Sequence, residues 1–130
     1  MICLETDFLV DVLRQQPLAL QKLEELTAAN KVLAVTPLTI TELFLGAFKS
    51  KKQENIALVE KACQSLKILD FDLLAAKMAG ELLNELNEKG KKIGDFDCVS
   101  GAICLRHSHD LVTNNKKHFE KINGLKIISW

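Results

Sequence analysis

The chain has 130 residues, of which 48% are hydrophobic and 26% are charged. These values are typical of one globular domain with a substantial core, so we expect a single domain over residues 1–130. Its 17 basic and 17 acidic residues cancel. The chain therefore lacks the overall positive charge that many nucleic-acid-binding proteins carry, and any binding to nucleic acid must use local basic patches.

No apolar run approaches the roughly 18 residues that a membrane span needs, and the N-terminus lacks a leader pattern. We therefore expect a cytoplasmic protein without membrane contact. The cysteines lie scattered in apolar segments without a CxxC pair, so reduced core thiols are expected at Cys3, Cys63, Cys98 and Cys104.

Hydrophobic spacing and Pro or Gly punctuation predict strands and helices in alternation. In the first half of the chain we expect a strand over 1–5, helices over 7–16 and 18–29, a strand over 31–36, and helices over 39–50 and 53–66. In the second half we expect a strand over 67–71, a helix from 72 through 86, a helix over 96–107, a strand over 110–114, a short helix over 118–122 and a strand over 124–129.

This alternation favours a parallel sheet with helices on both faces, because right-handed crossovers place the helices there. The predicted fold is therefore a three-layer α/β domain with a central parallel sheet of four to five strands.

Polar side chains gather where the predicted strands end, which is the edge at which open α/β sheets place their sites. Glu5 and Asp7 follow the first strand, and Glu42 lies in the first turn of the helix after the second strand. Two further acids open the helix over 96–107, and three polar residues end the strand over 110–114. These are Asp95 and Asp97, and Thr113, Asn114 and Asn115.

Clustered carboxylates repel one another unless a cation neutralises them. Oxygen ligands without His or Cys suit Mg²⁺ or Mn²⁺, which lower the pKa of a bound water and stabilise charge at a phosphodiester. Pairs of lysines adjoin three of the polar segments and form a candidate phosphate track. They are Lys51 and Lys52, Lys91 and Lys92, and Lys116 and Lys117.

Each acid also has a structural explanation. Asp7 suits a helix N-cap, and Thr39 with Glu42 matches a capping box in which Glu42 reaches back to the Thr39 N–H. Asp95 suits the cap of the next helix, and Asp97 suits the dipole of its first turn. His118 is expected to pack with Phe119 instead of serving the site.

Four motifs together resemble the PIN-domain ribonucleases, most closely the small VapC toxins of toxin–antitoxin pairs. They are "LETDFLVDVLR", "TPLTITELFLGA", "KIGDFDCVSGAICL" and "LVTNNKKHFEKINGLKI". Each motif is weak alone, but their order and their coverage of the whole chain make the combination specific.

The resemblance implies a Mg²⁺- or Mn²⁺-dependent endoribonuclease in which water is the nucleophile. Glu5, Glu42 and Asp97 fall on the family's metal-binding acids. Asn115 falls where many members have a fourth Asp, Thr113 is a supporting hydroxyl, and Asp95 is an extra carboxylate. The resemblance also implies a cognate VapB-type antitoxin, an RNA substrate and a homodimer.

Two departures bear on activity. Glu5 stands where the family nearly always has Asp, and its carboxylate lies on a stem one methylene longer. Asn115 supplies an oxygen but no charge. Displacing a reacting group by about 1 Å costs on the order of 10²-fold in rate. The alternative to a nuclease is therefore a catalytically impaired PIN-like protein that acts by binding antitoxin or RNA.

Overall fold

The computed structural model describes residues 1–29 and 31–130. In these residues strands and helices alternate, as predicted. The elements are, in chain order, β1 (Ile2–Leu4), α1 (Thr6–Leu13), α2 (Pro17–Ala28), β2 (Leu33–Val35), α3 (Pro37–Ser50), α4 (Gln53–Gln64), β3 (Lys67–Ile68), α5 (Leu73–Glu88), α6 (Asp95–Arg106), β4 (Asp110–Val112), α7 (Lys116–Phe119) and β5 (Ile127–Ile128).

The strands form one parallel sheet in the order β3-β2-β1-β4-β5. Cys3 at the middle of β1 pairs with Ala34 of β2 on one side and with Leu111 of β4 on the other. The chain passes outward from β1 first through β2 and β3, and then through β4 and β5. The topological switch point therefore lies between β1 and β4, where open α/β sheets place their binding sites.

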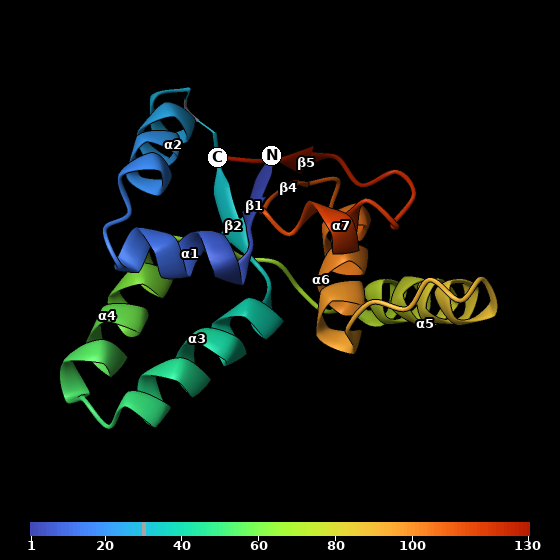
Figure 1. Ribbon diagram of the computed structural model, residues 1–130, viewed down its shortest axis with the longest axis horizontal. Coiled ribbons are helices and arrows are strands. Elements are labelled where there is room, and N and C mark those ends of the chain that lie inside the picture. Colours follow the sequence, from blue (N-terminus) through green and yellow to red (C-terminus); the bar gives the residue numbers. More distant parts are fainter. Residues whose placement is uncertain (30) are drawn as a thin grey trace.

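Two hydrophobic clusters pack on opposite faces of the sheet, because successive strand residues point to opposite sides. Ile2 and Leu4 join the cluster that includes buried residues of α1, α2, α3 and α4, whereas Cys3 joins the one that includes buried residues of α5 and α6. Figure 1 shows α1 to α4 on one side of the sheet and α5 to α7 on the other. The predicted three-layer architecture is confirmed.

Most helix boundaries agree with the prediction, but the strands are shorter than predicted. The predicted strand over 67–71 pairs only at Lys67–Ile68. Beyond Leu69 the chain turns into α5, whose first turn is capped by the Asp72 carboxylate accepting from the Ala75 N–H at 2.9 Å. The short helix begins at Lys116, two residues before the predicted start.

Small residues let α6 approach its neighbours closely. Ser100 is buried, and its hydroxyl lies 3.2 Å from the Thr36 hydroxyl at the end of β2. A Cβ atom added to Gly101 would lie 2.4 Å from the Cδ1 atom of Ile122, which is itself 2% exposed. Glycine at this position therefore sets the distance between α6 and the segment after α7.

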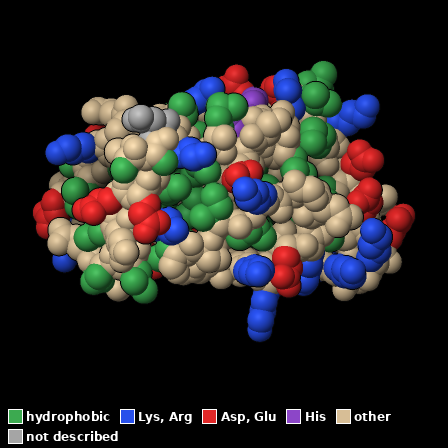
Figure 2. Space-filling view, turned by 90° about the horizontal axis from the view of Figure 1, so that it is seen from above, with side chains coloured by type: hydrophobic (Ala, Val, Ile, Leu, Met, Phe, Trp, Pro, Cys, Tyr) green, Lys and Arg blue, Asp and Glu red, His purple; other side chains and the backbone are tan. Residues whose placement is uncertain are grey.

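Positive and negative side chains are interspersed on the face shown in Figure 2, in keeping with a net charge of zero. Hydrophobic side chains gather in a hollow near the middle of the same face. All four cysteines are free, as predicted, and Cys3, Cys98 and Cys104 are buried, whereas Cys63, which was also expected in the core, is only partly buried. Within residues 1–29 and 31–130, no helix has the length and apolar character needed to cross a bilayer.

Candidate active site

Glu5 lies at the junction of β1 and α1, at the carboxyl end of the central strand. It is the N-cap of α1, and its Oε2 atom accepts a hydrogen bond from the Asp7 N–H at 3.3 Å. Its side chain is almost fully buried, with 6% exposed. The predicted N-cap role of Asp7 is therefore wrong, because α1 begins one residue before Asp7.

Two threonine hydroxyls connect Glu5 with Glu42. The Thr6 hydroxyl donates to Glu42 Oε1 at 2.9 Å and lies 3.3 Å from Glu5 Oε1. The Thr39 hydroxyl lies 3.2 Å from that of Thr6 and 3.4 Å from Glu5 Oε1. Glu42 therefore points across to α1, and these contacts bring the segments after β1 and β2 together.

The predicted capping box between Thr39 and Glu42 is wrong, because α3 begins before Thr39. The N-cap of α3 is Thr36, whose hydroxyl accepts from the Thr39 N–H at 3.2 Å. Pro37 takes the first helical position, where a missing N–H costs nothing. The helix thus starts earlier than predicted, and the Glu42 carboxylate does not cap it but accepts from Thr6.

Asp7 joins α1 to the end of β4. Its Oδ2 atom accepts from the Thr113 hydroxyl at 3.0 Å and from the Asn114 N–H at 2.9 Å, while Oδ1 accepts from the Phe8 N–H at 2.8 Å. Burial raises the pKa of Asp7, and these hydrogen bonds oppose that rise. With three donors already bound, this carboxylate holds the two neighbouring strand ends in register.

Asp97 lies in the first turn of α6, and α7 supplies its partner. His118 Nδ1 lies 3.0 Å from Asp97 Oδ2, and Asn115 Nδ2 lies 3.1 Å from the same ring nitrogen. The prediction that His118 packs with Phe119 is wrong. Phe119 is fully buried in the core, whereas His118 points from the same short helix toward the acid.

The electrostatics of Glu5 show that these acids converge. Burial and the neighbouring charge of Asp7 raise the pKa of Glu5 to about 7, although the hydrogen bond from the Asp7 N–H opposes the rise. The charges of Asp97 and Glu42 raise it further. The charges of three acids from three helix starts therefore reach Glu5 at the carboxyl edge of the sheet.

The chemistry of this donor set fits a hard divalent cation, because the converging groups are carboxylate, hydroxyl and amide oxygens. A cation would also relieve the repulsion that raises the pKa of Glu5. The coordination is not closed, however. In the described part of the chain, no three His, Cys, Asp or Glu side chains are arranged to hold a single ion.

The remaining predicted site residues lie around this centre. Asp95 is the exposed first residue of α6, and Gly94 is the N-cap of that helix, so the predicted cap at Asp95 is wrong. No hydrogen bond joins the Asp95 side chain to another of the described residues. The predicted lysines are all exposed, and they are Lys51, Lys52, Lys91, Lys92, Lys116 and Lys117.

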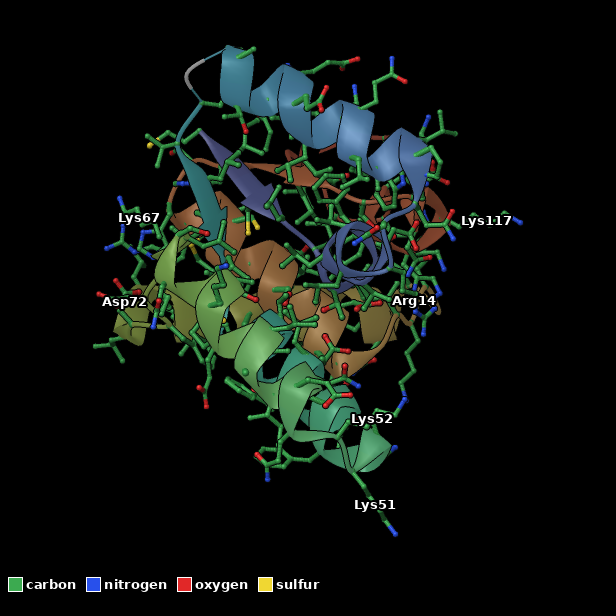
Figure 3. All side chains as sticks on the ribbon, turned by 90° about the vertical axis from the view of Figure 1, so that its left-hand side faces the viewer. Arg14, Lys51, Lys52, Lys67, Asp72 and Lys117 are labelled. Atoms are coloured by element: carbon green, nitrogen blue, oxygen red, sulfur yellow. The ribbon has the colours of Figure 1, made fainter. Side chains whose placement is uncertain are left out.

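Figure 3 shows where some of the basic side chains lie. Lys52, Lys117 and Arg14 lie along one edge of the molecule in this view, whereas Lys51 points away from the tip of the α3–α4 hairpin. Arg14 was not predicted as a site residue. It lines a cavity of about 310 Å³ together with Glu42, Ser50 and Asn55, so its basic side chain lies near that acid.

Sequence reasoning missed Thr6, Thr39 and His118 as parts of the site. Thr6 stands between the two acids Glu5 and Asp7, which was a usable signal. His118 follows Asn115 by three residues, a spacing that places both side chains on one side of a helical turn. Only the contact between α6 and α7 reveals that this side faces Asp97.

Comparison with known proteins identifies the family to which the chain is similar. A model of the family described as "PIN domain" matches residues 2–125. The "Ribonuclease VapC2" of Rickettsia felis is 33% identical over 128 residues, which cover 98% of this chain and 96% of that protein. The "tRNA(fMet)-specific endonuclease VapC" of Shigella flexneri is 28% identical over 128 residues, with the same coverage.

A solved structure gives the same result for the fold. It is that of VapBC2 from Rickettsia felis bound to a DNA fragment from its promoter. One chain of that complex matches with a TM-score of 0.90 and 33% identity, and the match covers 100% of this chain and 99% of that one. The fold of this chain therefore belongs to an architecture with known representatives.

Proposed function

This chain belongs to the PIN-domain family, and we propose that it is a metal-dependent endoribonuclease toxin of the VapC type. The observation that carries the proposal is the convergence of Glu5, Glu42 and Asp97 at the carboxyl edge of the sheet. Full-length similarity to ribonucleases supports it. We also propose that residues 1–130 form one PIN domain and that the protein acts in the cytoplasm.

Nucleases of this type depend on a divalent metal, and for this chain we propose Mg²⁺ or Mn²⁺. Glu5, Glu42 and Asp97 would hold it, with Asn115 contributing an amide oxygen and Asp95 an additional carboxylate nearby. When bound, the cation lowers the pKa of a water and stabilises negative charge on the phosphodiester. Three acids supply more negative charge than the cation's two positive charges, so the site does not repel it.

The other residues of the site act on position and on the substrate. Asp7 and Thr113 hold the ends of β1 and β4 together, and this fixes the backbone positions of Glu5 and Asn115. Exposed lysines on the surrounding segments attract the RNA backbone, because each phosphate carries a negative charge. Lys52 and Lys117 lie along the same edge of the molecule (Figure 3).

The proposed partner is a cognate VapB-type antitoxin, since the similar solved structures are VapBC complexes. A homodimer is the proposed state of the toxin itself. Exposed apolar side chains on the α3–α4 hairpin are available for such contacts, and they include Leu45, Phe48 and Leu58.

RNA cleavage tests the proposal. The substrates are initiator tRNA, suggested by the name of the Shigella flexneri relative, and a mixed RNA pool, each with Mn²⁺ or Mg²⁺. We expect the parent chain to cleave RNA, Asp97→Asn to abolish cleavage, and Glu5→Asp to raise the rate by roughly 10- to 100-fold, since the shorter stem restores the family geometry. Chelation with EDTA should stop every reaction.

Two other outcomes would change the conclusion. Cleavage by Asp97→Asn at the parental rate would show that the site is assigned to the wrong residues. Absence of cleavage by both the parent and Glu5→Asp would favour the catalytically impaired binding protein. That alternative has one structural observation in its favour, because the Glu5 carboxylate is engaged in capping α1.

A further inference from the structure

Polar contacts at the site run from Asp7 through Thr113 and Asn115 to His118 and Asp97. Asp7 accepts from the Thr113 hydroxyl at 3.0 Å, and that hydroxyl accepts from the Asn115 N–H at 3.0 Å. The Asn115 side chain then lies 3.1 Å from His118 Nδ1, which lies 3.0 Å from Asp97 Oδ2. The segment that follows β4 thus contacts the start of α1 through Asp7 and the start of α6 through His118.

The identity of the neighbours determines the tautomer of His118. An ionised carboxylate only accepts hydrogen bonds, so the contact with Asp97 requires a proton on Nδ1. A nitrogen that carries this proton cannot also accept from the Asn115 amide. The two contacts are therefore alternatives, and the contact with the Asp97 carboxylate is the stronger one because its acceptor is a charged group.

His118 is anchored well enough to act on Asp97. Its neighbour Phe119 is fully buried, and Ile122 on the same segment is 2% exposed and fits against Gly101 of α6. The backbone that carries the imidazole is thus fixed against the helix that carries the acid. Asp97, with 23% of its side chain exposed, has no other hydrogen-bond partner among the described side chains.

We propose that His118 is a positioning residue that orients the Asp97 carboxylate for metal binding. Its Nδ1–H holds Oδ2, and this leaves Oδ1 available to a cation. Without this bond the carboxylate is free to rotate, and a rotating ligand binds a metal less tightly because the rotation must be lost on binding. The inference rests on the proposed metal site and adds a residue to it.

Three variants of the full chain test the inference by Mn²⁺ binding, measured by calorimetry. In His118→Asn the amide nitrogen stands near the position of Nδ1, and in His118→Gln it stands near that of Nε2. His118→Ala removes the donor altogether. We expect His118→Asn to bind Mn²⁺ about as tightly as the parent, and His118→Gln and His118→Ala to bind it roughly 10- to 100-fold more weakly.

Thermal unfolding of each variant separates loss of folding from loss of orientation. If His118→Ala is unfolded, the comparison of the Asn and Gln variants still decides, because both carry an amide. Equal Mn²⁺ affinity of all variants and the parent would overturn the inference, and so would an equal loss in all three. In RNA cleavage we expect the same order in kcat with little change in KM.

Asp97→Asn is the control that separates this inference from the proposed function. If Asp97→Asn binds Mn²⁺ as tightly as the parent, the metal site itself is wrongly placed. If Asp97→Asn loses binding while the His118 variants keep it, the metal site stands and only the positioning role is overturned.

Discussion

Glu5 is a buried carboxylate with acidic neighbours on three sides, and it is held in place by its role as a helix cap. Burial and the charge of Asp7 raise its pKa from the ordinary value of 4.5 to about 7. A raised folded-state pKa contributes stability that is fully present below the unfolded value and is lost as the pH rises through the folded value. The ionised Glu5 side chain therefore lowers the unfolding free energy at alkaline pH when no cation is bound.

Glu5→Gln is expected to stabilise the protein in EDTA at pH 8. The amide keeps an oxygen that can accept from the Asp7 N–H but carries no charge. The change in pKa corresponds to about 3 kcal/mol at most, and the gain should shrink toward zero at pH 5, where the folded-state Glu5 is already protonated. Denaturant unfolding of both proteins at the two pH values measures this, and a gain of the same size at both would contradict it.

At the scale of elements, the site depends on how closely α6 lies against the segment that follows α7. Gly101 and Ser100 are the residues that permit this approach, from one side toward Ile122 and from the other toward Thr36. Since α6 carries Asp97 and α7 carries His118, the distance between the two elements also sets the distance between those side chains. Packing in the core is thus transmitted to the acid.

Gly101→Ala is expected to destabilise the protein by about 1–2 kcal/mol. The new methyl group collides with Ile122 Cδ1, which costs roughly 1–3 kcal/mol, and the better helix propensity of Ala returns up to about 1 kcal/mol. Ile122→Val removes the Cδ1 atom, so the double variant should lose less unfolding free energy than the two single variants lose together. A double-mutant cycle of unfolding free energies measures the coupling, and strict additivity would show that the contact is not strained.

At the scale of the whole molecule, the two ends of the parallel sheet differ in character. The carboxyl end carries the acids, whereas the amino end carries His109 beside the start of β4, where the Asp110 N–H donates to the Met1 carbonyl. His109 is 4% exposed, its Nδ1 lies 2.7 Å from the His107 carbonyl oxygen, and no described residue bonds its Nε2 atom. Burial lowers the pKa of His109, so it is neutral in the folded protein near pH 7.

His109→Asn is expected to change stability in acid without changing RNA cleavage. A lowered folded-state pKa contributes stability that is present above the unfolded value and is lost as the pH falls through the folded value. The parent should therefore lose more unfolding free energy than His109→Asn between pH 7 and pH 5. The Asn amide keeps a donor near the position of Nδ1, and an equal acid loss in both proteins would show that His109 is not responsible.

Much of this molecule follows from local sequence pattern. Alternating apolar segments and Pro and Gly positions were sufficient to predict a parallel three-layer fold, and the acids that follow the strands were sufficient to predict a site at the carboxyl edge of its sheet. Such features are local or periodic, because side-chain direction repeats along a strand or helix and parallel strands share one carboxyl edge.

The partners of the polar side chains were decided only by the tertiary structure. Asp7 and Glu42 each suited a helix cap by sequence, yet Asp7 binds the end of β4 and Glu42 binds Thr6. His118 was expected to pack with Phe119 and instead faces Asp97. Helix caps compete with partners from distant segments, and the outcome depends on the distance between elements, which the packing of residues such as Gly101 sets. The sequence by itself thus determined which groups reach the edge of the sheet, and the fold determined which of them touch.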